Sequence, residues 1–214
     1  MRKSLTSVDA MSLAQAISEA LEAAYDDITA LDAEVGDGDL GLTCRLGMAA
    51  VVEVLPTLAE LPLGEVLLKG GMAFNQAGAS TFGALVATAA MRAAKYAKDN
   101  GVQEWGLAEV IGVATAAAAG IEQRGKAARG DKTVLDAIWP GIEALEAAQG
   151  AGKGLAEALA EAAAAAQAGA EATKPLRSKF GRAAWMQDRT IGVQDAGATA
   201  VAVVVKAVAG WAGG

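Results

Sequence analysis

The stretch LAEALAEAAAAAQAGAEA, residues 155–172, consists almost entirely of residues that favour the α-helix. Alanine, the strongest helix former, makes up roughly a quarter of the whole chain. Only 4% of the residues are aromatic, whereas β-sheets favour aromatic and β-branched residues. We therefore predict an all-α fold in which small side chains let the helices pack closely.

Outward from this stretch, apolar residues recur at helical spacing in seven further segments, which brings the predicted total to eight helices. No repeat and no linker divides the chain, so we predict a single domain over residues 1–214, an antiparallel barrel or bundle of helices. Three long polar loops interrupt the pattern, at 32–41, 124–133 and 174–195. The seven further helices are predicted over residues 7–27, 42–50, 64–76, 82–98, 105–123, 134–148 and 196–212.

The charge of the chain limits its partners. With 18 basic and 25 acidic residues, the net charge is −7, which disfavours nucleic acid and anionic membranes as partners. The apolar stretch 196–213 is interrupted by Lys206, so we expect a buried helix there rather than a membrane span. The single cysteine, Cys44, cannot form an internal disulfide, which fits a cytoplasmic protein.

The chain contains no histidine. This excludes Ser-His-Asp and Cys-His catalysis and every zinc site that uses histidine. Without histidine to activate it, Cys44 is expected to be an inert packed residue. A metal site in this chain has to be built from oxygen ligands, which favours Mg²⁺ or Ca²⁺.

Three aspartates lie within eight residues, with no lysine or arginine between them, at Asp32, Asp37 and Asp39. In an extended segment Asp37 and Asp39 would point to the same side, and the glycines around them allow a tight turn. Three converging carboxylates repel one another unless a cation lies between them. From the residues alone, a divalent metal site and a solvated acidic turn with helix caps both remain open.

Further polar loops stand directly before predicted helices. Thr133 ends the sequence GDKT, Ser80 and Thr81 end GAST, and Arg182 and Asp195 lie in the last loop. Backbone N–H groups at a helix start bind anions, although each of these motifs also serves as an ordinary helix cap. Together they suggest one shared anion-binding pocket.

Three blocks of the sequence resemble a known family. DAEVGDGDLG at 32–41, RGKAARGDKTVLDAIWP at 124–140 and GRAAWMQDRTIGVQDAGAT at 181–199 are similar to signature blocks of the dihydroxyacetone kinase L subunit. The same unit forms the C-terminal nucleotide domain of single-chain dihydroxyacetone kinases. The resemblance runs from about residue 7 to the C-terminus, and it implies an eight-helix antiparallel barrel with its nucleotide site in loops at one end.

The resemblance also implies a set of site residues. Two Mg²⁺ ions held by Asp32, Asp37 and Asp39 would bind ATP or ADP, and Arg182 would neutralise phosphate charge. The three aspartates and Arg182 are thus the candidate catalytic residues. The turn at 78–83 aligns in two registers, which leaves Ser80 and Thr81 as alternatives. The remaining nucleotide contacts are expected at Leu40, Gly41, Leu42, Thr43, Gly125, Thr133, Val134, Asp195, Ala196 and Gly197.

The chain departs from the family pattern at three positions. Leu40 and Val193 stand where the family has histidine, and Ala196 stands where it has proline. The family also holds its ketose covalently on a histidine of a separate domain, which a chain without histidine cannot supply. A K-type ketose-binding partner subunit is therefore required.

The resemblance implies a kinase that acts on a short ketose, with glycerol metabolism as its setting. ATP as an exchangeable substrate is the reading we favour. The alternatives are ADP that stays bound and is rephosphorylated by a phosphohistidine protein of the phosphotransferase system, a regulatory nucleotide-binding protein, and a fatty-acid kinase domain. We also expect a homodimer.

Overall fold

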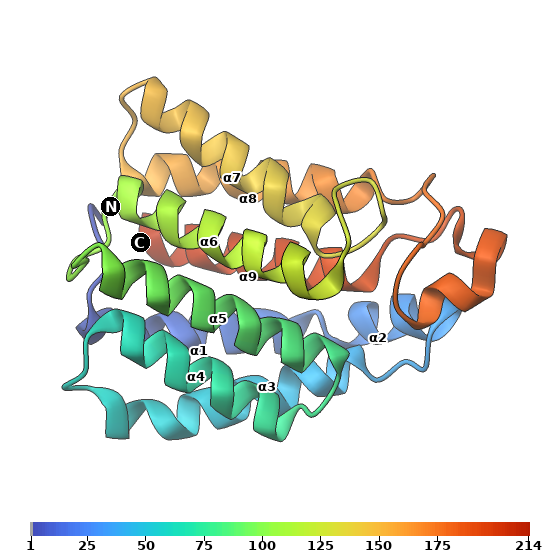
Figure 1. Cartoon of the computed structure of the whole chain (residues 1–214), viewed down its shortest axis with the longest axis horizontal. Helices are drawn as coiled ribbons and strands as arrows, with labels where there is room; N and C mark the ends of the chain where they lie inside the picture. The colour runs from blue at the N-terminus through green and yellow to red at the C-terminus, as the bar shows by residue number, and fades with distance from the viewer. Residues whose placement is uncertain (1) are drawn as a thin grey trace.

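The computed structural model describes residues 2–214, and within that range it contains helices and no β-strand. Eight long helices lie roughly along one direction (Figure 1). Short 3₁₀ segments occur at Ser7–Asp9 (η1), Leu55–Leu58 (η2) and Arg182–Thr190 (η3). The eight helices are α1 (Ala10–Ala23), α3 (Leu40–Val54), α4 (Leu63–Ala77), α5 (Thr81–Asp99), α6 (Leu107–Gly125), α7 (Leu135–Gly150), α8 (Leu155–Glu171) and α9 (Ala196–Gly213).

These eight helices form a closed ring. From α3 to α9 each helix packs against the next along the chain, and α1 closes the circle by packing against both α9 and α3. The predicted eight-helix barrel is therefore confirmed. A ninth helix, α2 (Tyr25–Val35), continues α1 beyond the ring and packs on α3, α9 and η3.

The first predicted helix is wrong in its extent. Instead of one helix over 7–27, the chain forms η1, α1 and α2, with a break at Ala24, and α2 runs on to Val35. Ala24 has φ −95° and ψ 5°, outside the α-helical region, although alanine itself favours the helix. The helix propensity of alanine therefore does not explain the break at this residue. Asp32 consequently lies inside a helix rather than at the start of a loop.

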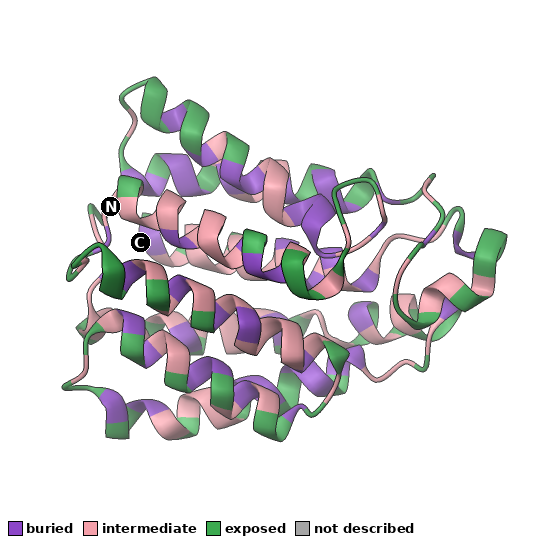
Figure 2. Cartoon of the chain, viewed as in Figure 1, coloured by how far each residue is buried: buried purple, intermediate pink, exposed green. Residues whose placement is uncertain are grey.

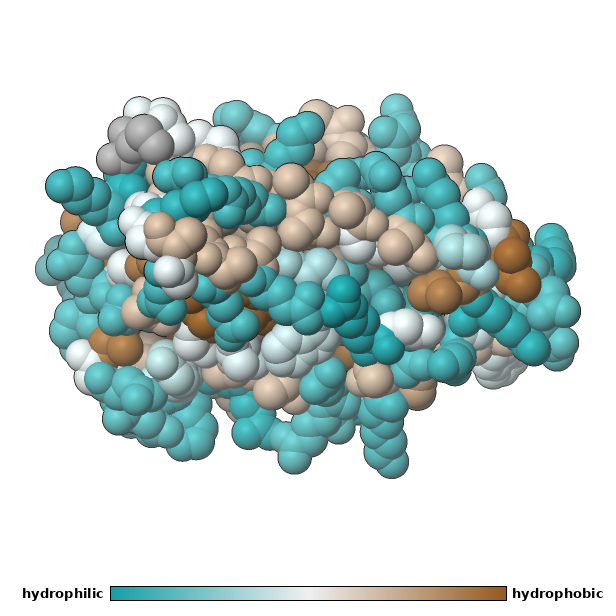
Figure 3. Space-filling view, turned by 90° about the horizontal axis from the view of Figure 1, so that it is seen from above, coloured by the Kyte–Doolittle hydropathy of each residue, from teal (hydrophilic) through white to brown (hydrophobic). Residues whose placement is uncertain are grey.

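Small residues set the spacing between the helices. Four alanines of α8 that recur every four residues, Ala158, Ala162, Ala166 and Ala170, are each at most 1% exposed. Such a stripe lets α8 approach α7 and α9 closely, and Figure 2 shows the buried positions on the sides of the helices that face one another. Seen from above, weakly hydrophobic residues lie between hydrophilic ones along the outer face (Figure 3).

One crossing of α7 and α8 depends on a glycine. Pro140 lies inside α7 and has no N–H to donate to the carbonyl group of Asp136, four residues earlier. That carbonyl oxygen faces Gly169 of α8, where a Cβ atom would lie only 2.1 Å from it. A glycine at 169 therefore allows the two helices to approach at this point.

Two helical stretches, Leu40–Leu58 and Ala196–Gly213, are long and apolar enough by length and composition to cross a membrane. Both belong to the helix ring: α3 packs on α1 and α4, and α9 packs on α1 and α8. Only 39% of the first stretch and 28% of the second is buried, so the burial predicted for 196–213 is partial.

Candidate functional site

The polar loops meet at one end of the barrel. The connections α2–α3, α4–α5, α6–α7 and α8–α9 all lie at the right of Figure 1, while both ends of the chain lie at the left. The backbone N–H of Arg2 donates to the carbonyl group of Ala212, which holds the two ends together. All candidate site residues from the sequence lie at or beside the loop end.

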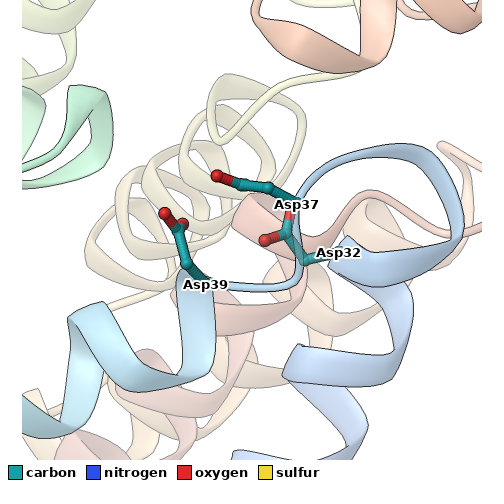
Figure 4. Close-up of side chains that lie close together, drawn as sticks. All are labelled: Asp32, Asp37 and Asp39. Atoms are coloured by element: carbon teal, nitrogen blue, oxygen red, sulfur yellow. The ribbon is translucent and has the colours of Figure 1, made fainter.

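The three aspartates converge there (Figure 4). Asp32 projects from α2, Asp37 lies in the turn, and Asp39 precedes the first residue of α3. One carboxylate oxygen from each lies within 4.8 Å of the others. The turn relies on glycine, since Gly38 has φ +73° and a Cβ atom on Gly36 would lie 2.7 Å from Oδ1 of Asp32.

Binding to a helix start accounts for only one of the three carboxylates. Asp39 stands at the N-cap position of α3, yet its side chain makes no capping hydrogen bond. Asp32 alone is tied to the backbone, because its Oδ2 accepts from the N–H of Leu40 at 3.1 Å. The other two carboxylates accept no backbone hydrogen bond from the described part of the chain, and oxygen donors of this kind and spacing suit a hard divalent cation such as Mg²⁺.

Arg182 lies against the aspartate cluster. It reaches over from η3, forms an ion pair with Asp37, and places Nη1 3.6 Å from Oδ2 of Asp39. Its side chain is 62% exposed. A guanidinium group in this position offsets the repulsion between the carboxylates, and it can also bind phosphate in a bidentate manner.

The residues expected after the aspartates divide between core and surface. Leu40 and Thr43 are 8% and 7% exposed, and Leu40 packs in the same apolar cluster as Ile28 and Ala196. Leu42 is 44% exposed, while Gly41 is buried. The side chain of Leu40 is thus part of the core, and the segment 40–43 offers mainly backbone to a ligand at this end.

Ser80 and Thr81 are distinguished by their hydrogen bonds. Ser80 caps α5, where its hydroxyl oxygen accepts from the N–H of Gly83 at 3.0 Å. Thr81 is exposed, and its hydroxyl group makes no hydrogen bond within the described residues 2–214. Thr81 is therefore the freer of the two hydroxyl groups.

The loop before α7 is folded onto a buried aspartate that sequence reasoning missed. Asp136 accepts from the N–H of Gly130 at 2.6 Å and from the N–H of Thr133 at 2.7 Å. The hydroxyl oxygen of Thr133 accepts from the N–H of Leu135 at 3.3 Å, and Val134 is buried. Gly125 is the last residue of α6 and opens the same loop.

Asp195 caps α9 beside the aspartate cluster, and Ala196 and Gly197 follow it in the helix. Its Oδ2 accepts from the N–H of Ala198 at 2.7 Å. Loss of water contact raises the pKa of Asp195 to about 6, and the carboxylates of Asp136 and Asp32 act in the same direction. The Ala198 N–H and the Lys132 ammonium group act against this rise. Asp195 is therefore close enough to the cluster to sense its charge.

Two ionisable side chains, those of Cys44 and Lys132, are almost fully buried. Cys44 is 2% exposed, and burial raises the pKa of its thiol to about 12, which agrees with the predicted inert role. Lys132 is also 2% exposed, although it lies within a polar loop. The sequence predicted a helix cap or an anion-binding turn in this loop, and no local pattern signals that its lysine will be buried.

Comparison with known proteins agrees with this architecture. Residues 34–210 match the protein-family model described as the DAK2 domain. The chain is 34% identical over 182 residues to the ADP-binding subunit DhaL of the PEP-dependent dihydroxyacetone kinase of Escherichia coli K12, covering 85% of this chain and 86% of that one. It is 34% identical over 196 residues to the D-erythrulose kinase of Mycolicibacterium smegmatis, covering 91% of this chain and 33% of that one.

The fold is also similar to a solved structure. The crystal structure of the dihydroxyacetone kinase from C. freundii in complex with AMP-PNP and Mg²⁺ matches 94% of this chain and 33% of that one, with a TM-score of 0.72 and 26% identity. The resemblance expected from the three sequence blocks is confirmed, and the chain belongs to the DAK2 domain family.

Proposed function

We propose that this chain is the Mg–ATP-binding, phosphoryl-donating subunit of a dihydroxyacetone-type kinase. The observation that carries the proposal is the convergence of Asp32, Asp37 and Asp39, with Arg182 beside them, at the loop end of the barrel. The similar proteins support it, since they include a dihydroxyacetone kinase subunit named as ADP-binding and a dihydroxyacetone kinase crystallised with AMP-PNP and Mg²⁺.

In this proposal the three aspartates hold two Mg²⁺ ions, which when bound would neutralise the charge of the nucleotide phosphates. Arg182 exchanges its ion pair with Asp37 for the phosphate oxygens. The free hydroxyl group of Thr81, and backbone N–H groups at the starts of α3, α5, α7 and α9, supply further donors. Gly125, Thr133, Val134 and Asp195 to Gly197 border the nucleotide.

The acceptor belongs to a partner. A short ketose, triose or tetrulose, is held on a separate K-type subunit, because this chain has no histidine to bind it covalently. We also propose that the chain forms a homodimer and that it lies in the cytoplasm. A regulatory role is the alternative to test against, since Leu40 and Val193 replace histidines of the family pattern.

The test of the function is a kinase assay with and without the partner. We expect Mg–ATP to bind to the purified chain, and dihydroxyacetone phosphate to form only when the cognate K-type subunit is added. Binding without transfer in the complete mixture would favour the regulatory role. Steady turnover by the single chain would contradict the need for a partner.

A second mode of action, in which ADP stays bound to the chain, is supported by an observation of its own. The relatives from E. coli and Listeria innocua that match over 86% and 82% of their length are named as ADP-binding subunits of PEP-dependent kinases. ADP that stays bound would then be rephosphorylated by a phosphohistidine protein. Release of the nucleotide by acid from freshly purified protein distinguishes the modes, because stoichiometric ADP favours bound ADP and an empty site favours exchangeable ATP.

Leu40 allows a further prediction. Replacement by histidine puts a polar ring into the apolar cluster around Ile28, so Leu40→His should lower the free energy of unfolding by about 1–3 kcal/mol. The affinity for Mg–ATP should change by no more than about tenfold, or 1.4 kcal/mol, because the aspartates and Arg182 stay in place. Chemical denaturation and titration calorimetry measure the two effects.

Leu40→Met is the control for Leu40→His, since it keeps the volume and the apolar character of the side chain. It should leave the affinity unchanged. A rise in phosphoryl transfer by several orders of magnitude in Leu40→His would show that the parent is a weakened kinase, and the regulatory role would then replace our proposal.

A further inference from the structure

The ammonium group of Lys132 is enclosed by backbone carbonyl groups. Its Nζ lies 3.0 Å from the oxygen of Thr173, 3.1 Å from that of Leu176 and 2.7 Å from that of Thr190, and it also contacts the oxygen of Val193. Burial of an ammonium ion is tolerated only when its three N–H groups find acceptors. Here every acceptor within hydrogen-bond distance is a main-chain oxygen, so the lysine binds a particular backbone conformation.

The four carbonyl groups come from two separate pieces of chain. Thr173 and Leu176 follow α8, whereas Thr190 and Val193 precede α9. Between these two stems runs the segment 177–189, which contains Arg182. Lys132 therefore joins the two stems of this segment at their base.

Other hydrogen bonds connect the same stems. The N–H of Ser178 donates to the hydroxyl oxygen of Thr190 at 3.0 Å, and the N–H of Gly192 donates to the carbonyl group of Lys174 at 2.7 Å. Thr190 is fully buried, as is Thr173, whose hydroxyl oxygen accepts from the N–H of Asp195 at 2.9 Å. The base of the segment is thus a buried polar network, and Lys132 contributes a positive charge to it.

The loop that carries Lys132 is itself held in place. Asp136 fixes the loop on both sides of the lysine through the N–H groups of Gly130 and Thr133. The neighbouring residue, Asp131, forms an ion pair with Lys179 at 2.6 Å. Lys132 has a φ of +62°, a backbone conformation that lysine rarely takes. It makes its contacts with the two stems from this conformation.

The charges around Lys132 link it to the site. Desolvation lowers the pKa of Lys132, and the carboxylates of Asp195 and Asp136 act in the opposite direction. Asp195 in turn senses the charge of Asp32 in the aspartate cluster. The lysine therefore lies between the anchored loop before α7 and the start of α9.

We propose that Lys132 is a positioning residue, which closes the base of segment 177–189 and so places Arg182 beside Asp37 and Asp39. The residue does not touch the aspartates; it acts through the segment that carries Arg182. The effect on nucleotide affinity rests on the proposed function, whereas the order of segment 177–189 can be measured without any nucleotide.

The first test measures the order of segment 177–189 in the full chain. Lys132→Met leaves the four carbonyl groups without their donor, so trypsin should cleave after Arg177, Lys179, Arg182 and Arg189 at least tenfold faster than in the parent. Mass spectrometry identifies the cleaved bonds, and hydrogen exchange of the same amides gives an independent measure. Circular dichroism of the helices should stay unchanged at the assay temperature.

Lys126→Met is the matched control. Lys126 lies in the same loop and also has a positive φ, of 54°, but it is exposed and caps the end of α6. Its replacement removes the same charge, and cleavage within 177–189 should stay within twofold of the parent. Equal acceleration in both variants would overturn the proposal, since loss of charge alone would then explain it.

The second test asks whether Lys132 acts through Arg182. We expect Lys132→Met and Arg182→Ala each to weaken Mg–ATP binding by about tenfold, and the double variant to weaken it no further. Losses that multiply to about a hundredfold would overturn the positioning role. If the parent itself does not bind Mg–ATP, the proposed function fails, while the cleavage experiment still decides the role of Lys132 at the base.

Thr190→Val tests the same hydrogen-bond network if Lys132→Met does not fold. This change removes the hydroxyl group that joins Ser178 to the second stem but introduces no unpaired charge. It should accelerate cleavage within 177–189 by several-fold. Unchanged cleavage in Thr190→Val, together with an unfolded Lys132→Met, would show that the network supports the whole fold rather than the segment.

Discussion

Asp39→Asn should lower the affinity for Mg–ATP by more than a hundredfold and leave the helical fold intact. The carboxylate of Asp39 lies in the cluster with Asp32 and Asp37, and it makes no capping bond whose loss would disturb α3. An amide is neutral and offers one oxygen, so it is a much weaker ligand than a carboxylate for a hard divalent cation such as Mg²⁺. A hundredfold loss corresponds to about 2.7 kcal/mol of binding free energy.

The measurement is titration calorimetry with Mg–ATP, paired with chemical denaturation of the protein without ligand. Without ligand, the free energy of unfolding should change by less than about 1 kcal/mol, because the exposed ion pairs with Arg182 stabilise the protein little. Asp37→Asn should behave in the same way. Asp27→Asn is the control, since Asp27 is an exposed residue of α2 outside the cluster. Nucleotide affinity retained by both cluster variants would refute the metal site.

Gly169→Ala should lower the free energy of unfolding by about 3 kcal/mol, at the upper end of what overpacking usually costs. The new Cβ atom would lie 2.1 Å from the carbonyl oxygen of Asp136 and 3.1 Å from the ring of Pro140. Both belong to helix α7, so neither can rotate away as the tip of a flexible side chain could. Helices α7 and α8 would have to separate along their contact.

Gly141→Ala is the matched control for this prediction. Gly141 faces α8 from α7, and its Cβ atom would meet ordinary contact distances, 3.6 Å to the carbonyl oxygen of Ala162 and 3.8 Å to the Cβ of Ala166. Alanine should therefore be neutral there or stabilise by up to about 1 kcal/mol through helix propensity. Urea denaturation followed by circular dichroism compares the two variants, and equal stability would contradict the close approach at Gly169.

The helices could be predicted because their composition and periodicity are local properties. The alanines of 155–172 and the apolar spacing elsewhere gave the eight members of the ring, whose ends differ from prediction by a few residues. The break at Ala24 could not be predicted, because alanine favours the helix and no glycine or proline stands at this position. The sequence predicted that Asp32 lies at the end of the preceding helical segment but put the end of that helix at residue 27, whereas α2 runs to Val35.

The candidate site was predictable where its residues are close in sequence. Asp32, Asp37 and Asp39 lie within one turn and its flanks, so their spacing and the glycines between them were sufficient. Lys132 was missed because its acceptors lie 41 to 61 residues away along the chain. At Leu40 the family resemblance is misleading. It implies a polar contact at this position, whereas the side chain of Leu40 packs in the core.

The burial of Cys44 makes the molecule convenient for spectroscopy. With a pKa of about 12, almost none of this thiol is ionised near neutral pH, and only the thiolate reacts with maleimides and similar reagents. A cysteine introduced at Trp185, a residue of η3 that is 89% exposed, would then be the one group that takes up a fluorophore or a spin label. Motion of η3 relative to the barrel could thus be followed in solution without removing the native cysteine.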